Sequence, residues 1–167
     1  MKTVYLAGGC FWGVQKYFDN MAGVMSTEVG YANGPDSPPG YRDVCAGSGH
    51  AETVRIKYDP AAITLTELLH AYFLVIDPLS INRQGGDIGV QYRTGIYHTE
   101  QEQIAEIEAA CRAEEEKLGA RLEVERMPLK NFFPAEEYHQ KYLDKNPDGY
   151  CHIPRHFFEK KGKTSET

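Results

Sequence analysis

The chain has 167 residues, of which 41% are hydrophobic, 25% charged and 11% aromatic. This composition excludes collagen, a disordered chain and a repeat array, and it predicts a single domain over residues 1–167 that can fold alone. The formal net charge is −6, and no basic run occurs before residues 160–163, which argues against a protein that binds nucleic acid through its phosphates.

Cysteine usage and hydropathy bear on where the protein works. The four cysteines form no CxxC pair and are too sparse for the disulfide framework of a secreted protein, so we expect a cytoplasmic location. The apolar stretch before Cys10 is shorter than that of a secretory signal. No apolar run approaches the roughly 20 residues that span a bilayer. We therefore expect no membrane partner, and we expect a monomer.

Hydrophobic spacing predicts four elements in the first part of the chain. They are a buried strand at residues 3–7, a helix at 11–21, a strand at 24–31 and an alternating strand at 53–58. Gly8 and Gly9 end the first strand, so Cys10 lies at a strand-to-helix junction. The composition of residues 33–40 and 47–49 predicts a long loop between the last two strands.

Two capping boxes mark helices in the second part of the chain. Thr64 with Glu67 precedes one apolar stripe, and Thr99 with Glu102 precedes another, which Gly119 ends. The other predicted segments are a loop at 80–91, strands at 94–98 and 122–127, a short helix at 134–143, a coil at about 145–160 and a flexible tail at about 161–167.

The order of these elements predicts the fold class. It contains the βαββαβ succession of a ferredoxin-like plait, with additional helices and a C-terminal coil. We therefore expect an α+β domain of two layers, in which helices cover a largely antiparallel sheet.

Cys10 is the first candidate for chemistry. The free N–H groups at the start of a helix stabilise a thiolate, so its position predicts a lowered pKa and a reactive sulfur. The alternative is a small buried side chain without reactivity. In the segment Gly9-Cys10-Phe11-Trp12-Gly13, however, the only tryptophan and a phenylalanine follow the thiol directly, and the flanking glycines allow another molecule to approach closely.

This five-residue segment resembles the signature of the A-type peptide methionine sulfoxide reductases (MsrA). Further matches follow in the same order and extend the resemblance over about residues 3–151. They are Gly30-Tyr31-Ala32, Tyr41-Arg42-Asp43-Val44-Cys45, Gly49-His50-Ala51-Glu52, the run from Arg83 to Arg93 and the run from Phe132 to Tyr142. The resemblance implies reduction of the S epimer of methionine sulfoxide, free or in peptides and proteins, as repair of oxidative damage.

The resemblance also implies a role for each matching residue. Reduction of a sulfoxide by a thiol requires a nucleophile, an acid that protonates the departing oxygen, and hydrogen-bond donors. In an aromatic pocket, burial would keep a carboxyl protonated for that task. The implied roles are Cys10 as nucleophile, Glu52 as acid, Tyr41 and Tyr92 as donors to the oxygen, Asp87 as the residue that orients this network, and Phe11 and Trp12 as contacts of the S-methyl group.

Recycling of the thiol is implied as well. Cys10 would become a sulfenic acid, which condenses with a second thiol to a disulfide. Cys151 resembles the family's resolving cysteine, and no cysteine follows it here, which implies that thioredoxin reduces a Cys10–Cys151 disulfide directly. Cys45, in the active-site loop, is an alternative resolving thiol. Cys111 belongs to the apolar stripe of its helix, which predicts a structural role.

Other chemistries have less support. The sequence contains no nucleotide-binding glycine motif, and the spacing of Cys151, His152 and His156 matches no zinc site, so we expect neither cofactor nor metal. His50 is expected to stabilise its loop by hydrogen bonds. Two rival functions are a thiol peroxidase that uses Cys10, and a module that binds oxidised methionine without turning it over.

Overall fold

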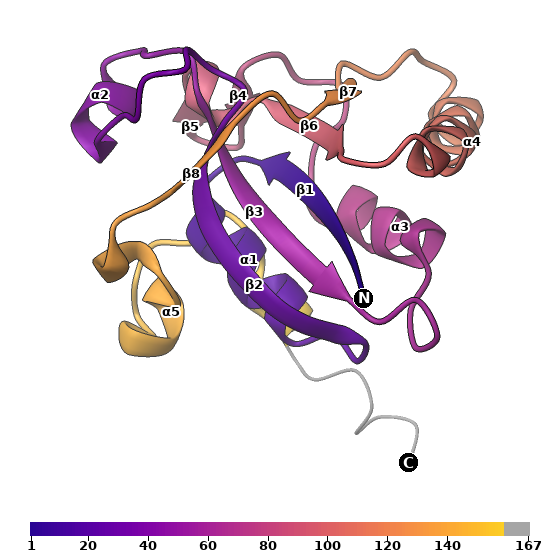
Figure 1. Cartoon of the computed structure of the whole chain (residues 1–167), viewed down its shortest axis with the longest axis horizontal. Helices are drawn as coiled ribbons and strands as arrows, with labels where there is room; N and C mark the ends of the chain where they lie inside the picture. The colour runs from indigo at the N-terminus through magenta and orange to yellow at the C-terminus, as the bar shows by residue number, and fades with distance from the viewer. Residues whose placement is uncertain (159–167) are drawn as a thin grey trace.

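A computed structural model of the chain describes residues 1–158. Its centre is a curled sheet of six strands in the order β7-β6-β1-β3-β2-β8 (Figure 1). Neighbouring strands are antiparallel except β6 and β7, which are parallel. The strands are β1 (Lys2–Gly8), β2 (Val24–Ala32), β3 (Ala51–Tyr58), β6 (Thr94–His98), β7 (Glu125–Pro128) and β8 (Phe132–Pro134).

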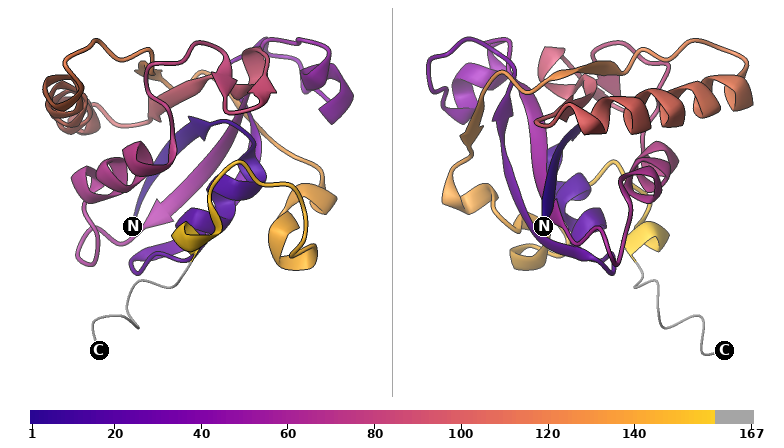
Figure 2. Two further views of the ribbon diagram at one scale, coloured as in Figure 1. Left: turned by 180° about the vertical axis from the view of Figure 1, so that it is seen from behind. Right: turned by 45° about the vertical axis from the view of Figure 1, so that its right-hand side comes forward.

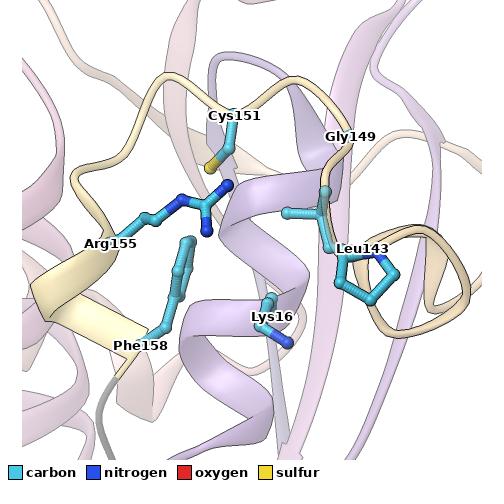
Figure 3. Close-up of a pocket in the computed structure, with 7 residues that line it drawn as sticks. Lys16, Leu143, Gly149, Cys151, Arg155 and Phe158 are labelled. Carbon is cyan, nitrogen blue, oxygen red and sulfur yellow. The ribbon is translucent and has the colours of Figure 1, made fainter.

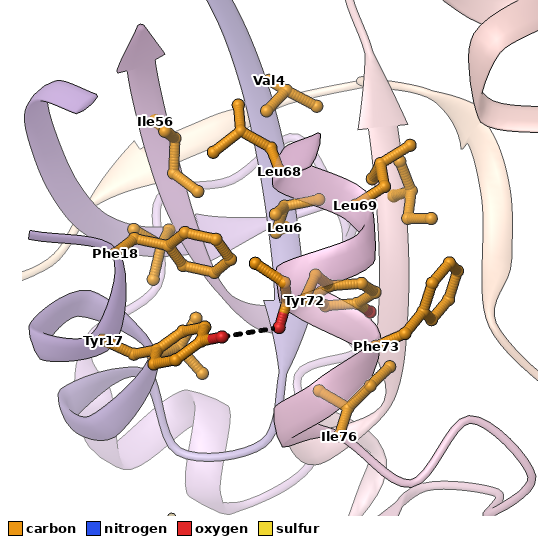
Figure 4. Packing of buried hydrophobic residues seen from close by; sticks show 14 of the residues in the cluster. Val4, Leu6, Tyr17, Phe18, Ile56, Leu68, Leu69, Tyr72, Phe73 and Ile76 are labelled. Atoms are coloured by element: carbon orange, nitrogen blue, oxygen red, sulfur yellow. Dashed lines mark hydrogen bonds between the residues drawn. The ribbon is translucent and has the colours of Figure 1, made fainter. Parts of the chain in front are cut away.

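Helices α1 (Phe11–Asp19) and α3 (Leu65–Val75) cover one face of the sheet, and α4 (Glu102–Leu118) packs against α3 (Figure 2). Tyr17 and Phe18 of α1 meet Tyr72 of α3 over the strands, in the main hydrophobic core (Figure 4). The mixed α/β class predicted from the sequence is confirmed. Because α1 is anchored in this core, the residue that precedes it, Cys10, is held in a fixed position.

The two predicted capping boxes differ in outcome. Thr64 caps α3, since its side chain accepts a hydrogen bond from the Glu67 backbone and Glu67 reciprocates. The prediction of a capping box from Thr99 and Glu102 is wrong. Gln101 is the N-cap residue of α4, and its side chain makes no capping hydrogen bond. The Gln103 side chain accepts from the backbone N–H of Thr99 instead. The predicted stop at Gly119 is confirmed, with a left-handed φ of 65°.

Three short elements occur where the sequence predicted only loop. They are α2 (Tyr41–Cys45), the hairpin of β4 (Arg83–Gln84) and β5 (Asp87–Ile88), and the 3-10 helix η1 (Val90–Tyr92). Each is too short for a hydrophobic period to develop, so pattern reading could not detect it. All three carry residues that the sequence had marked for chemistry.

The helix predicted at 134–143 is wrong. Pro134 ends β8, and the segment continues as a 3-10 turn, η2 (Glu137–His139), and a short helix, α5 (Tyr142–Lys145). The Gln140 amide explains the difference, because it accepts from the backbone N–H of Val29 at 3.0 Å and donates to the Val29 carbonyl at 2.9 Å. The Gln140 side chain thus bonds to β2 as the backbone of a neighbouring strand would. This pairing keeps the backbone around Gln140 from forming a helix.

The end of the described chain is largely irregular, as predicted, up to the 3-10 helix η3 (Arg155–Phe158). The strand predicted at 122–127 begins later, at Glu125. The tail predicted at about 161–167 lies outside the described residues. Within residues 1–158 no helix is long and apolar enough to cross a membrane.

Candidate active site

Cys10 lies between β1 and α1, at the N-cap position of the helix, and is buried with 7% of its surface exposed. The chain reaches this position through Gly9, whose φ of +84° is left-handed. A Cβ on Gly9 would lie 2.8 Å from Cβ of Gln84 in β4. Both observations require glycine here, since other residues rarely adopt this backbone and have no room for a side chain.

Glu52 of β3 lies beside this junction and is 1% exposed. Its Oε1 accepts a hydrogen bond of 3.1 Å from the backbone N–H of Phe11, the first residue of α1. Burial, with a smaller contribution from the charge of Asp87, raises the pKa of Glu52 to about 8. The direction of this shift agrees with the expectation that burial keeps the carboxyl protonated near neutral pH.

The predicted fall in the pKa of Cys10 is wrong. Burial raises the pKa of this thiol well above its ordinary value, and the charge of Glu52 raises it further. Only the backbone N–H of Trp12 acts in the opposite direction. The helix start is outweighed here, because a thiolate in a dry site loses its hydration and Glu52 already accepts the first free N–H of the helix.

Tyr41 of α2 and Tyr92 of η1 lie near Glu52, and both are partly buried. Burial raises the pKa of each phenol, aided by Cys45 and then Glu52 at Tyr41 and by Glu52 at Tyr92, so both hydroxyls keep their protons and can donate. Asp43 and Glu136 fix the start of α2, since they accept from the backbone N–H of Gly40 and Tyr41 respectively. The short elements of the loops thus bring these tyrosines to the carboxyl.

The aromatic residues after Cys10 pack in different ways. Phe11 is buried, with its ring 5.7 Å from that of Tyr31. Trp12 is half-buried and stacks on Tyr142, with ring centroids 3.7 Å apart. Its Nε1 donates to Nδ1 of buried His139 over 2.9 Å. The matching run from Phe132 to Tyr142 contained His139 and Tyr142, but the sequence assigned neither a role.

Cys151 lies in the coil before η3, half-buried, and its sulfur rests on the first turn of α1. A Cβ added to Gly13 would lie 2.6 Å from Sγ of Cys151. All four cysteines are free thiols in the structure. Cys111 is fully buried in α4, in agreement with its predicted structural role, whereas Cys45 is exposed at the end of α2.

A cleft of about 310 Å³ opens on the outer side of Cys151 (Figure 3). Its walls combine apolar side chains with the cations of Lys16 and Arg155, and it is lined by Lys16, Leu143, Pro147, Gly149, Cys151, Arg155 and Phe158. Cys151 can therefore be approached through this cleft.

Asp87 of β5 lies between the surroundings of Cys10 and the coil that carries Cys151. Burial, together with nearby Asp87, raises the pKa of Tyr150 to about 12, and His152 Nδ1 lies 4.0 Å from Asp87 Oδ2. Among the residues described, no group of three or more His, Cys, Asp or Glu side chains is placed to hold a metal ion. His50 bonds to Ser48 and to the Pro35 carbonyl, as expected of a residue that stabilises its loop.

The whole chain was compared with known protein families. The family model described as peptide methionine sulfoxide reductase matches residues 2–167. The chain belongs to this family. The peptide methionine sulfoxide reductase MsrA of Clostridium acetobutylicum is 53% identical over 161 residues, which cover 96% of this chain and 99% of that protein. The MsrA of Lachnoclostridium phytofermentans is 52% identical over 159 residues, covering 95% and 96%.

Solved structures agree with this assignment. Mxr1 from Saccharomyces cerevisiae in reduced form superposes with a TM-score of 0.86 at 38% identity, covering 92% of this chain and 91% of that one. Methionine sulfoxide reductase A of Corynebacterium diphtheriae gives 0.85 at 36% identity, covering 92% and 82%. Mxr1 in complex with Trx2 gives 0.61 at 26% identity, covering 84% of each chain. These relatives support methionine sulfoxide reductase activity for this chain.

Proposed function

We propose that the protein reduces the S epimer of methionine sulfoxide, free or in peptides and proteins, with Cys10 as nucleophile and Glu52 as acid. The observation that carries the proposal is the buried carboxyl of Glu52, protonated up to a pH of about 8 beside the Cys10 thiol. Because both groups are neutral, the pair of Cys10 and Glu52 carries no net charge before the substrate binds. Such a site suits a neutral and strongly dipolar sulfoxide.

The reaction balances with the groups at hand. The Cys10 sulfur attacks the methionine sulfur, the sulfoxide oxygen takes the carboxyl proton of Glu52, and the thiol proton restores the carboxyl. The oxygen then passes from the methionine sulfur to the Cys10 sulfur. The products are a Cys10 sulfenic acid and methionine. Tyr41 and Tyr92, whose hydroxyls stay protonated, donate to the oxygen as negative charge develops on it.

Selectivity for the S epimer follows from shape in this proposal. Phe11 and Trp12 contact the S-methyl group, while the oxygen is directed toward Glu52 and the tyrosines. The stack of Trp12 on Tyr142 and its hydrogen bond to His139 support this, because they fix the indole plane. In the R epimer the methyl group and the oxygen would exchange places, or the rest of the substrate would be displaced from its site. In either case the oxygen would no longer reach the carboxyl of Glu52.

The second half of the proposed cycle uses Cys151 and thioredoxin. The Cys151 thiol attacks the Cys10 sulfenic acid, which forms the disulfide and releases water. Thioredoxin supplies the two electrons that restore both thiols. The contact of Cys151 with the first turn of α1, the cleft that opens on its other side, and the relative solved with Trx2 support this sequence.

We also propose the finer features expected from the sequence. The strand order β6-β1-β3-β2, with antiparallel neighbours, supports a ferredoxin-like plait at the centre of a single domain. The sparse, unpaired cysteines support work in the cytoplasm, and we propose a monomer without cofactor or metal.

The test is a single turnover with the separate S and R epimers of an N-acetylated methionine sulfoxide amide, followed by mass mapping of the disulfide. We expect methionine from the S epimer alone, and a Cys10–Cys151 bond. Cys10→Ser should abolish the product, while Cys151→Ser should allow one turnover and then stall with thioredoxin. Cys45→Ser is the matched control and should behave like the wild type.

Each other outcome rejects a defined part of the proposal. A Cys10–Cys45 bond would keep the enzyme and transfer the resolving role to Cys45. Faster turnover of hydrogen peroxide than of the sulfoxide would favour a thiol peroxidase. Tight binding of the sulfoxide without product would favour a module that recognises oxidised methionine.

A further inference from the structure

The side chain of His152, directly after Cys151, is enclosed in the protein although it belongs to an irregular coil. Only 6% of the imidazole is exposed. It lies over the turn before Cys10, since a Cβ on Gly9 would be 3.1 Å from its Nε2, and beside the β4–β5 hairpin near Gly85. Such burial of a polar ring in a coil requires an explanation, because it costs free energy unless the ring finds partners.

Three buried polar atoms gather here without a hydrogen bond in the part of the chain that the structure describes. They are both ring nitrogens of His152 and Oδ2 of Asp87. Nδ1 and Oδ2 face each other at 4.0 Å, so a shift of about 1 Å would bring them within hydrogen-bond distance. Burial lowers the pKa of His152, and Asp87 and the Gly8 backbone offset this effect only in part, so the ring is neutral. The tautomer that carries its proton on Nδ1 is the one that can donate to Asp87.

Cys151 is flanked on both sides by residues that reach this carboxylate. Tyr150 lies close enough to Asp87 for this carboxylate to add to the effect of burial in raising the tyrosine pKa, and His152 Nδ1 lies 4.0 Å from Asp87 Oδ2. The sulfur between them rests on Gly13, in the helix that begins after Cys10. Because Tyr150 itself is half exposed, the buried imidazole is the firmer of the two anchors.

We propose that His152 is a positioning residue that anchors the coil to Asp87 and so keeps Cys151 within reach of the Cys10 sulfenic acid. The inference rests on the proposed function, in which Cys151 resolves Cys10. His152 takes no part in the bonds that change: the two cysteines form one disulfide, and the hydroxyl of the sulfenic acid leaves as water. Asp87 then serves both steps, since it orients the sulfoxide site and anchors the resolving coil.

The experiment separates the two steps in the full chain. Reduced protein is mixed with excess S epimer and quenched over time, and methionine, dimedone-trapped sulfenic acid and the Cys10–Cys151 disulfide are measured. For His152→Ala we expect disulfide formation to slow about tenfold or more. Methionine formation in the first turnover should stay within about twofold of the wild type, so trapped sulfenic acid accumulates.

Two variants distinguish positioning from packing. His152→Asn places an amide N–H where Nδ1 lies, and should restore most of the rate of disulfide formation. His156→Ala removes an exposed histidine four residues further along, and should match the wild type. Equal disulfide rates in the wild type and His152→Ala would overturn the inference, as would an Asn variant as slow as the Ala variant, or methionine formation that slows in parallel. A wild type that forms no methionine would instead overturn the proposed function, and this inference with it.

Discussion

The backbone N–H of Phe11 donates a hydrogen bond to the carboxyl of Glu52, so the start of α1 holds this carboxyl beside Cys10. A free helix start would favour a thiolate at Cys10. Here that donor is occupied, and the carboxyl shares the dry surroundings of the thiol. The start of α1 therefore orients the Glu52 carboxyl, while burial leaves the Cys10 thiol protonated at rest.

Replacement of Glu52 by glutamine should slow methionine formation about 10²–10⁴-fold, because an amide can donate a hydrogen bond but cannot deliver a proton. In the wild type the neutral thiol–carboxyl pair reacts, so the rate should fall as the pH rises through about 8, the pKa of Glu52. The slower Gln variant should lack this fall. Single-turnover rates from pH 6 to 10 test both statements, and an unchanged rate in the variant would remove Glu52 from the reaction.

The titration of Glu52 should also change the free energy of unfolding with pH. Burial raises the pKa of Glu52 from 4.5 to about 8, so between these values the folded state holds a proton that the unfolded chain has lost. The free energy of unfolding of the wild type should therefore fall, relative to Glu52→Gln, as the pH rises across this range. Denaturant unfolding of both proteins at several pH values measures the difference, and parallel curves would contradict the buried carboxyl.

Gly13→Ala should slow formation of the Cys10–Cys151 disulfide. Alanine in place of glycine normally stabilises a helix by about 0.5–1 kcal/mol, but here the new Cβ would lie 2.6 Å from Sγ of Cys151 and must displace it. We expect about a tenfold slower disulfide step, with methionine formation little changed. Gly86→Ala, where a Cβ would meet nothing within 4 Å, is the control.

Trp12→Phe keeps an aromatic wall but removes the donor to Nδ1 of His139. A buried nitrogen left without its partner should lower the free energy of unfolding by about 1–3 kcal/mol. The freed ring should also raise KM more than it lowers kcat. Tyr138→Phe, at an exposed ring next to the same histidine, should change neither quantity. An unaltered KM in the Trp12 variant would argue against a role in substrate contact.

Tyr17→Phe should cost stability without affecting chemistry. The Tyr17 hydroxyl donates to the Ala71 carbonyl over 2.9 Å and links α1 to α3 inside the core (Figure 4). Loss of this hydrogen bond should reduce the free energy of unfolding by about 1 kcal/mol, while the ring still fills its space. Thermal unfolding and single-turnover rates, measured together, check the two halves of this statement.

Much of the fold was predictable because its signals are local. The alternation of Val54, Ile56 and Tyr58 predicted β3, and the box at Thr64 predicted the start of α3. The helix predicted at 134–143 failed for the opposite reason, since the Gln140 amide pairs with a strand more than a hundred residues away in sequence. A pattern within one segment carries no information about such a partner.

In the candidate site, too, some features were predictable from local motifs and others depended on distant parts of the chain. The motifs predicted side chains that gather around Cys10, and the structure brings Glu52 and Tyr92 near Cys10 and Tyr41 near Glu52. The direction of the Cys10 pKa was not predictable, because it depends on how completely distant segments exclude water. The link between His152 and Asp87 was invisible for the same reason, since it exists only once the coil folds over the hairpin.

The unequal exposure of the four thiols has a practical consequence for any redox assay. Cys45 alone is exposed, whereas Cys10 and Cys111 are buried and Cys151 is half-buried. An alkylating reagent applied to the native reduced protein will therefore label Cys45 first and report little about the proposed Cys10–Cys151 pair. Quantitative thiol titration of this enzyme should begin from a Cys45→Ser background, in which the slow reagent kinetics of Cys10 and Cys151 become the measured signal.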